Sequence, residues 1–276
     1  MNAHPPAPRD EAAFETRSHP LRMRMLEVVD LARPTPRVVR VTLAGDDFDG
    51  FRSASASDHV KLFVPDPGER VARVPVLGPD GIRPDPNGDR PIGRDYTPRH
   101  HQLASGRLEI DIVLHPGGRA ASWAETAAVG DVVGVAGPRG SRVLRRVPRR
   151  LVLVGDETGL PAIHNFLLGA DASRRVDVVA SVADAGEVQP LETDAALGVA
   201  WIDRAVVGDA TASVIGALAA LDRPGASTLV FVAGEASMVS AVRGWVRRTW
   251  EVPSEWIDAR GYWKQGAADH QEPHDD

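Results

Sequence analysis

The chain has 276 residues, 43% of them hydrophobic, so it is long enough to form two domains that each bury a core. Its formal net charge of −6 argues against nucleic acid and against an anionic membrane surface as partners. The absence of cysteine excludes disulfides, thiolate nucleophiles, iron–sulfur clusters and cysteine-type zinc sites, and the nine histidines lack metal-binding spacing, so no metal cofactor is expected.

The first 20 residues predict a mobile tail. Residues 1–18 are polar, with prolines and acidic residues where a secretory signal needs an apolar run, so we expect a cytoplasmic protein. No window approaches the ~18 uninterrupted apolar residues of a membrane span, and we expect no such span.

Residues 21–147 predict a closed, six-stranded antiparallel barrel. Runs rich in β-branched residues alternate with turn signals, and they lie at 21–30, 37–45, 58–65, 94–99, 107–114 and 130–138. In the third run Val60, Leu62 and Val64 share one face, so Lys61 is expected to point away from the core. Residues 65–93 are dense in proline and glycine, which indicates a functional or disordered loop.

The run at 94–99 has the composition of a flavin site. Arg94 and Tyr96 point the same way on a strand, so one suits a pyrophosphate and the other can lie against a ring. Thr97 follows, and Pro98 holds it in the extended region. The alternative is an edge strand with a solvated arginine, a core tyrosine and a turn.

A glycine turn after His115 leads into a short helical pattern that runs to about Ala128. Small residues at a helix start leave backbone N–H groups open to an anion such as a diphosphate. A second contact to a dinucleotide cofactor is therefore expected at this turn.

Residues 148–276 predict a parallel sheet with helices, because apolar runs alternate with helical patterns. The loop after the first run lacks the G-x-G-x-x-G pattern, and Asp156 and Glu157 would repel a phosphate bound directly on them. A nucleotide must therefore bind differently here. The alternative is that Asp156 or Thr158 only caps the following helix.

A second loop of the same kind closes the apolar run at 228–233 with Gly234 and Glu235. Parallel α/β sheets bind ligands at the carboxyl ends of their strands. Two such loops in one sheet predict a site at that edge.

Five motifs occur in an order that resembles the siderophore-interacting protein family, cytoplasmic flavoproteins similar to ferredoxin reductases. They start at Arg94, His115, Gly155, Ala233 and Gly261, and the resemblance runs over about 22–266. It implies that Tyr262 and Trp263 cover the site. It also implies that FAD and the nicotinamide contact Arg94, Asp95, Tyr96, Thr97, Asp111, Ile112, Val113, His115, Gly118, Ala120, Ala121, Ser122, Trp123, Asp156, Thr158, Glu235 and Trp263.

The chain departs from the family pattern at four positions. Pro116, Arg119 and Ala121 replace residues that usually grip the phosphate, so that grip depends on Ser122 or Arg119 compensating. Gly159 stands where alanine is common, a departure expected to matter less.

The resemblance implies a domain order and a reaction. An FAD-binding barrel at 21–147 precedes an NAD(P)H-binding α/β domain at 148–276 with a C-terminal lid, and electrons pass from NAD(P)H through FAD to ferric iron in a siderophore. The alternatives are a general flavin reductase, a ferredoxin-fed reductase, and a siderophore-binding protein without reductase activity. Asp184 is expected either to select NADH through the ribose hydroxyls or to be a turn residue.

Only two of the 32 basic residues are lysines, Lys61 and Lys264. An ammonium group on a flexible stem follows anionic chelates of varied shape better than a guanidinium fork does. We therefore expect Lys61 and Lys264, with Arg260, to line one substrate pocket beside the isoalloxazine edge. The alternative is two solvated lysines that persist by chance.

Overall fold

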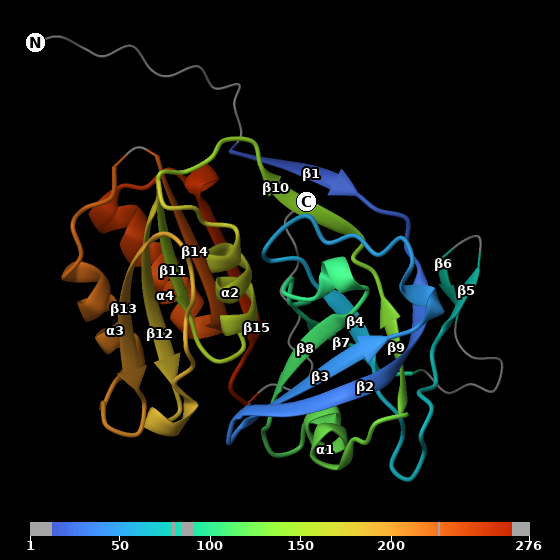
Figure 1. The fold of residues 1–276 in the computed structure, drawn as a ribbon. Helices are drawn as coiled ribbons and strands as arrows, with labels where there is room; N and C mark the ends of the chain where they lie inside the picture. The colour runs from blue at the N-terminus through green and yellow to red at the C-terminus, as the bar shows by residue number, and fades with distance from the viewer. Residues whose placement is uncertain (1–12, 79–80, 84–90, 226, 267–276) are drawn as a thin grey trace, which may run out of the picture.

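The computed structural model describes residues 13–78, 81–83, 91–225 and 227–266. Figure 1 shows two halves side by side, a β-barrel with one short helix and a parallel sheet with helices on both faces. The predicted fold class is confirmed for both halves.

The barrel is one six-stranded antiparallel sheet in the order β7-β4-β9-β2-β3-β8. A bridge between Arg99 and Glu109 brings the segment after β7 to β8 and so links the two ends of this order. Side chains such as Leu26, Val41 and Ile110 fill the interior with no exposed surface. The strands are β2 (Met23–Thr35), β3 (Val38–Ala44), β4 (Val60–Phe63), β7 (Arg94–Tyr96), β8 (Leu108–Val113) and β9 (Val132–Ala136).

Smaller elements complete this half. Helix α1 (Arg119–Thr126) packs on the barrel core through Trp123 and Ala124. Within residues 65–93, the described part contains a short hairpin of β5 (Val76–Gly78) and β6 (Gly81–Arg83). Two 3-10 turns, η1 (Asp46–Phe48) and η2 (Leu103–Ser105), lie between strands.

The predicted mobile tail is wrong for residues 14–18. Strand β1 (Phe14–Ser18) pairs antiparallel with β10 (Gly140–Leu144) along its whole length. The Phe14 ring packs at the edge of the α/β core, and the Arg142 guanidinium lies 4.0 Å from its centroid. A single apolar residue in a polar stretch gives no periodic signal, so the sequence did not predict this strand. Residues 1–12 lie outside the described residues.

The α/β half is a five-stranded parallel sheet in the order β13-β12-β11-β14-β15. Helix α2 (Leu160–Leu168) covers one face, and α3 (Ala210–Ala219) and α4 (Ala236–Trp245) cover the other. The strands are β11 (Arg150–Gly155), β12 (Arg175–Val182), β13 (Ala196–Asp203), β14 (Thr228–Glu235) and β15 (Ile257–Trp263). Short turns η3 (Ala185–Glu187), η4 (Val246–Trp250) and η5 (Ser254–Trp256) complete the half.

Strand β15 was not predicted as a strand. Its residues pair in parallel with β14, with a register shift between Gly234 and Glu235. The segment expected to be a lid is therefore an edge strand up to Trp263, and its backbone is fixed by the sheet.

Polar contacts join the two halves. The Asn165 side chain on α2 donates to the carbonyls of Ala56 and Pro98 at 3.0 and 2.9 Å, and it accepts from the His100 N–H at 2.8 Å. The carboxylate of Glu187 accepts from the Thr35 hydroxyl at 2.6 Å. Among the described residues, no helix has the length and apolar character needed to cross a membrane.

Candidate functional site

The carboxylate of Asp156 joins three segments at the carboxyl edge of the parallel sheet. Its Oδ1 accepts from the N–H and the hydroxyl of Thr158 at 2.8 and 2.5 Å. Its Oδ2 accepts from the Glu235 N–H and from the Trp263 indole Nε1, each at 2.8 Å. Asp156 is only 3% exposed. Four predicted site residues therefore lie together, and the loop after β11 and the ends of β14 and β15 are tied to one buried charge.

Two glycines make this convergence possible. Gly234 has φ +142°, and a Cβ there would lie 2.5 Å from Asp156 Oδ2. A Cβ on Gly159 would lie 2.7 Å from the Ala233 carbonyl oxygen, which is backbone and cannot rotate away. Helix α2 therefore begins closer to β14 than an alanine at position 159 allows.

Glu235 serves as the N-cap of α4. Its carboxylate accepts from the Ser237 N–H at 2.7 Å and from the Met238 N–H at 3.0 Å. Partial burial opposes ionisation, but the hydrogen bonds from Ser237, Met238 and Gln265 lower the pKa of Glu235 overall. An ionised carboxylate thus stands at the start of α4 beside the Asp156 cluster.

The barrel meets this cluster through β15. Tyr262 is half-buried, its hydroxyl is buried beside Thr97, and burial raises the pKa of the phenol. Arg260 donates to the Ser57 carbonyl at 2.9 Å and also binds Asp258. Thr97 of the predicted flavin motif and the Tyr262-Trp263 segment therefore face one another across the junction of the two halves.

The flavin motif combines a core tyrosine with an accessible arginine. Burial raises the pKa of Tyr96 to about 12, although nearby Arg94 opposes the shift. The phenol is protonated at neutral pH, as an unshifted tyrosine also is, and it can donate a hydrogen bond. Arg94 is half-buried and donates to its neighbour's carbonyl at 3.2 Å. Lys61 and Asp95 are paired opposite each other on β4 and β7, and their charged groups lie 2.9 Å apart.

The turn before α1 fits a diphosphate through its backbone. No side chain caps the helix start at Gly118, so the first-turn N–H groups keep their capacity to bind an anion. A Cβ on Gly118 would lie 2.4 Å from the ring of the exposed His115, so any other residue there would require that side chain to move. Arg119 is ion-paired with Asp66. Of the two compensating residues considered, Arg119 is therefore engaged elsewhere, and Ser122 is exposed.

The β8 residues offer backbone rather than side chains. The Asp111 carboxylate accepts from Arg40 at 2.6 and 2.9 Å and from Arg99 at 3.1 Å, and Ile112 is fully buried in the core. β8 is the last strand in the sheet order, and beyond the Arg99–Glu109 bridge its outer edge pairs with no further strand among the described residues, so a ligand could bind its backbone toward Val113. Ala120, Ala121 and Trp123 are buried on the inner side of α1 and support the turn.

The structure also places Lys61 and Asp184. Lys61 points away from the interior filled by Val60 and Leu62, as predicted. Asp184 caps the η3 turn by accepting from the Gly186 N–H at 2.9 Å, and it also pairs with Arg37, which favours the turn alternative over ribose binding.

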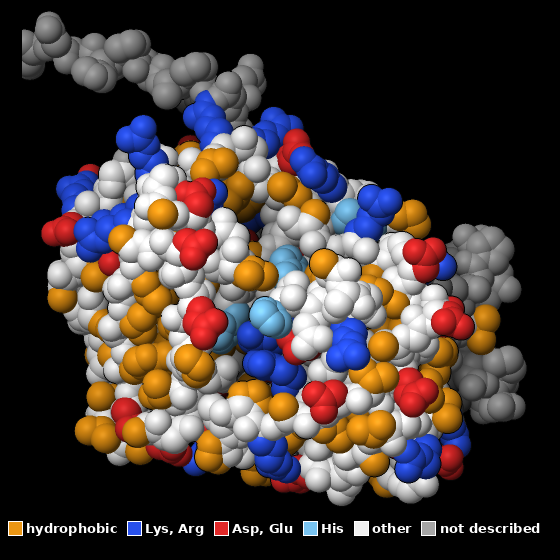
Figure 2. Space-filling model, in the orientation of Figure 1, with side chains coloured by type: hydrophobic (Ala, Val, Ile, Leu, Met, Phe, Trp, Pro, Cys, Tyr) orange, Lys and Arg blue, Asp and Glu red, His pale blue; other side chains and the backbone are white. Residues whose placement is uncertain are grey.

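Sequence reasoning missed the contacts along the domain junction. His164 of α2 lies near Arg99, Asp111 and Arg40 of the barrel, and burial, followed by the Arg99 charge, lowers its pKa to about 4. Figure 2 shows histidine and basic side chains gathered in the hollow between the halves. The available signal was His164 and Asn165 inside an otherwise apolar helical segment, since buried polar residues need partners.

A flavin barrel joined to a parallel nucleotide-binding sheet, with both motifs at their junction, defines a two-domain flavoprotein of the reductase type. A siderophore-interacting FAD-binding domain model matches residues 27–142, and a siderophore-interacting protein model matches residues 148–266. The chain therefore belongs to the siderophore-interacting protein family.

Named relatives agree with this assignment. The chain is 41% identical over 147 residues to a protein of Escherichia coli (strain K12) named NADPH-dependent ferric-chelate reductase, an alignment covering 53% of this chain and 57% of that relative. It is 30% identical to ferric vibriobactin reductase ViuB of Vibrio cholerae, covering 91% of this chain and 94% of that relative. A crystal structure of a siderophore utilization protein from T. fusca matches with a TM-score of 0.84 and 33% identity, covering 94% and 98% of the two chains.

Proposed function

We propose that this protein transfers electrons from NAD(P)H through FAD to ferric iron held in a siderophore, releasing ferrous iron. The observation that carries the proposal is the junction at Asp156. There the nucleotide-side loops at Thr158 and Glu235 and the aromatic end of β15 meet the Thr97 end of the flavin motif. The names of the relatives, a ferric-chelate reductase and a ferric vibriobactin reductase, support the same reaction.

The barrel residues fit FAD. Tyr96 and Thr97 would contact the flavin, Arg94 the diphosphate, and the free N–H groups after Gly118 its other phosphate oxygens. When bound, FAD accepts two electrons from the nicotinamide and gives them up one at a time to iron.

The remaining chemistry requires positioning and exclusion of water. Asp156 holds Trp263 and the Glu235 backbone, and all four of its hydrogen bonds are made within the protein. The overall reaction converts one NAD(P)H and two ferric ions into NAD(P)⁺, one proton and two ferrous ions. No described side chain needs to act as acid or base, because the cofactors carry the redox chemistry.

Three basic residues form the proposed substrate pocket. Lys61, Arg260 and Lys264 would attract an anionic chelate, with Arg260 anchored by Asp258 and Lys264 exposed just beyond β15. Lys61 is shared with Asp95, so its contribution depends on exchanging that partner for the chelate. We also place the domain boundary at Pro148, between β10 and β11.

Anaerobic stopped-flow absorbance tests the reaction. NADPH or NADH should bleach the flavin band, and a ferric siderophore should restore it with two ferrous ions formed per flavin. If only a reduced ferredoxin bleaches the flavin band, the electron donor is a ferredoxin and not a nicotinamide. Reoxidation by free flavins but not by ferric chelates would favour the general flavin reductase, and a colourless purified protein that binds siderophore would favour the binding protein.

Lys61→Ala and Lys264→Ala test the substrate pocket. Each should raise the KM for an anionic ferric chelate by up to about fivefold, because an exposed charge contributes about 0.2–1 kcal/mol. Flavin reduction by NAD(P)H should stay at the wild-type rate. Wild-type chelate kinetics in both variants would place the substrate elsewhere.

A further inference from the structure

Arg24 is a buried cation without an ion-pair partner among the residues that the structure describes. Two arginines in the described chain are more than nine-tenths buried, Arg24 at 4% exposure and Arg99 at 8%. Arg99 has Asp111 at 3.1 Å and Glu109 at 3.8 Å. Arg24 makes one hydrogen bond, from Nη1 to the Gly137 carbonyl at 3.1 Å, and its Nε has no partner. A buried charge is costly unless it is paired, so Arg24 calls for a counter-charge.

The position of Arg24 aims it at one end of the barrel. On β2 it shares the face of Leu26 and Val28, which are completely buried in the barrel core. Its guanidinium lies 5.3 Å from the centroid of the Phe51 ring. Burial and the nearby Arg22 lower the pKa of Arg24, while the charge of Asp47 opposes this shift. The guanidinium is thus held at the mouth of the barrel by packing on an aromatic ring.

A cavity of about 240 Å³ opens at this point, and its charged lining is entirely basic. Arg22 is fixed beside it by a hydrogen bond to the Asp49 carbonyl at 3.1 Å, and His19 is held by the Ser141 hydroxyl at 2.8 Å. Arg52 on the rim is exposed and forms no ion pair with an acidic side chain among the described residues. The lining residues are His19, Pro20, Arg22, Arg24, Gly50, Arg52, Gly137 and Pro138.

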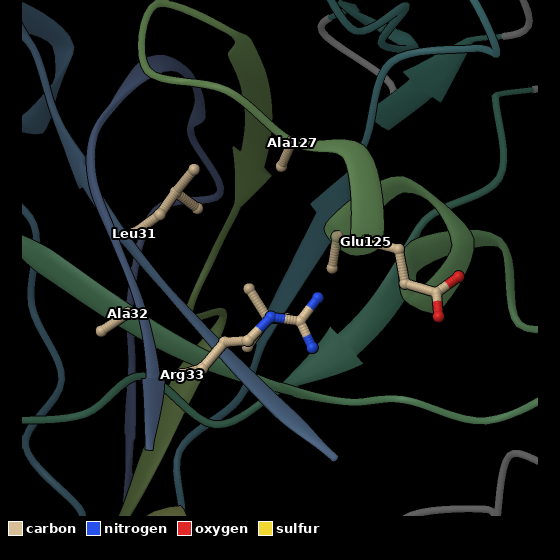
Figure 3. Close-up of a pocket in the computed structure, with 7 residues that line it drawn as sticks. Leu31, Ala32, Arg33, Glu125 and Ala127 are labelled. Carbon is tan, nitrogen blue, oxygen red and sulfur yellow. The ribbon is translucent and has the colours of Figure 1, made fainter. Parts of the chain in front are cut away.

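A second cavity, of about 270 Å³, has a different lining. It lies outside the barrel between β2, β3 and α1. Its lining includes one basic and one acidic side chain, and Figure 3 shows Arg33 extending from β2 toward α1, which carries Glu125. Its charges balance, so it has no preference for an anion, whereas the lining of the Arg24 cavity adds three arginines in a chain whose net charge is −6.

We infer that the Arg24 cavity is a binding site for a multiply charged oxyanion, separate from the FAD and nicotinamide sites. Three guanidinium groups present forked N–H donors that match phosphate and carboxylate oxygens. The cavity is built from the start of β2, the segment after η1 and the turn between β9 and β10, and none of these segments carries a residue assigned to FAD. Its size admits a phosphate group or a small polycarboxylate such as citrate.

Isothermal titration of the FAD-loaded full chain tests this site, with inorganic phosphate and citrate as probes and chloride at equal ionic strength as reference. Arg52→Ala should weaken binding about tenfold, the loss of one charge-assisted contact. Arg33→Ala is the matched control, an exposed arginine at the other end of β2, and should bind like the wild type. Tighter binding of phosphate identifies a phosphate ligand, and tighter binding of citrate identifies a polycarboxylate.

Arg24→Met provides a second, independent measurement. Without anion, this variant should melt at the same or a higher temperature than the wild type, because it removes an uncompensated buried charge while keeping the side chain's bulk. Phosphate or citrate should raise the melting temperature of the wild type but not of the variant. The inference is overturned if neither probe binds better than chloride, if Arg33→Ala weakens binding as much as Arg52→Ala, or if Arg24→Met still responds to the anion.

Discussion

The polar side chains of the site differ in whether their hydrogen-bonding atoms are already used within the protein. Asp156 and Asp111 have their oxygens occupied by protein donors. Tyr96, with its pKa raised to about 12, keeps a proton to donate. The family resemblance named Asp156 and Tyr96 together as cofactor contacts, but their surroundings assign them different tasks.

Arg94→Ala should reduce the affinity for FAD by about one to two orders of magnitude, since a charge-assisted hydrogen bond contributes about 1.5–3 kcal/mol. Flavin absorbance retained after dialysis measures the effect. Arg107→Ala is the control, an exposed arginine at the start of the β8 segment. Equal flavin occupancy in Arg94→Ala and the wild type would remove Arg94 from the cofactor site.

At the scale of elements, regular patterns were predictable and isolated ones were not. The alternation around Leu62 and the continuous apolar run at 151–154 predicted β4 and β11 correctly. Strand β1 has one useful apolar residue, Phe14, and is ordered by its partner β10, which lies more than a hundred residues away in the chain. Strand β15 is mostly polar or aromatic and gains its regularity from β14. Such strands depend on long-range pairing that a local pattern does not contain.

The candidate site was predictable as a set of residues but not as a geometry. The motifs named Asp156, Thr158, Glu235 and Trp263, and the structure brings these four together. Asp156 accepts hydrogen bonds from Glu235 and Trp263 where the pairing of β14 and β15 shifts register at Gly234. No spacing in the sequence reveals this register shift.

Helix α2 contributes a pH-dependent term to stability through His164. Burial lowers the pKa of His164 to about 4 in the folded protein, below its ordinary value of 6.5, so the unfolded chain binds the proton more strongly. The stability that neutral, buried His164 gives to the folded state is fully present above pH 6.5. It is lost as the pH falls toward 4, because the unfolded chain takes up a proton at this residue first. The unfolding free energy should therefore fall with acid by up to about 1.4 kcal/mol per pH unit from this group.

Denaturant unfolding between pH 4 and 7 measures this term when the wild type is compared with His164→Gln. The variant cannot take up a proton at this position, so its stability should change less steeply with pH. The same steepness in both proteins would mean that His164 is already protonated in the folded state or is free to leave its pocket.

At the scale of the whole molecule, the two halves depend on a few polar contacts for their relative placement. Asn165 makes three hydrogen bonds to barrel backbone at Ala56, Pro98 and His100. Glu187 binds Thr35 and the Arg37 N–H on the β2–β3 hairpin. These contacts set how the nicotinamide half faces the flavin half.

Asn165→Ala should destabilise the protein by about 1–3 kcal/mol for each barrel group left without a partner at the junction. It should also slow flavin reduction by NAD(P)H more than it weakens FAD binding, because the barrel itself is unchanged. Thermal unfolding and stopped-flow reduction measure the two effects. Ser105→Ala, on the exposed η2 turn, is the control. Normal reduction kinetics together with lowered stability would limit Asn165 to a structural role.

The tight start of α2 restricts the substitutions open to this chain. An alanine in place of Gly159 would put a methyl group 2.7 Å from the Ala233 carbonyl oxygen. Because that oxygen belongs to the β14 backbone, a residue with a Cβ at position 159 requires helix α2 and β14 to move apart. A single Gly159→Ala exchange should therefore disturb this junction, whereas the same exchange made together with changes that shift α2 should be tolerated.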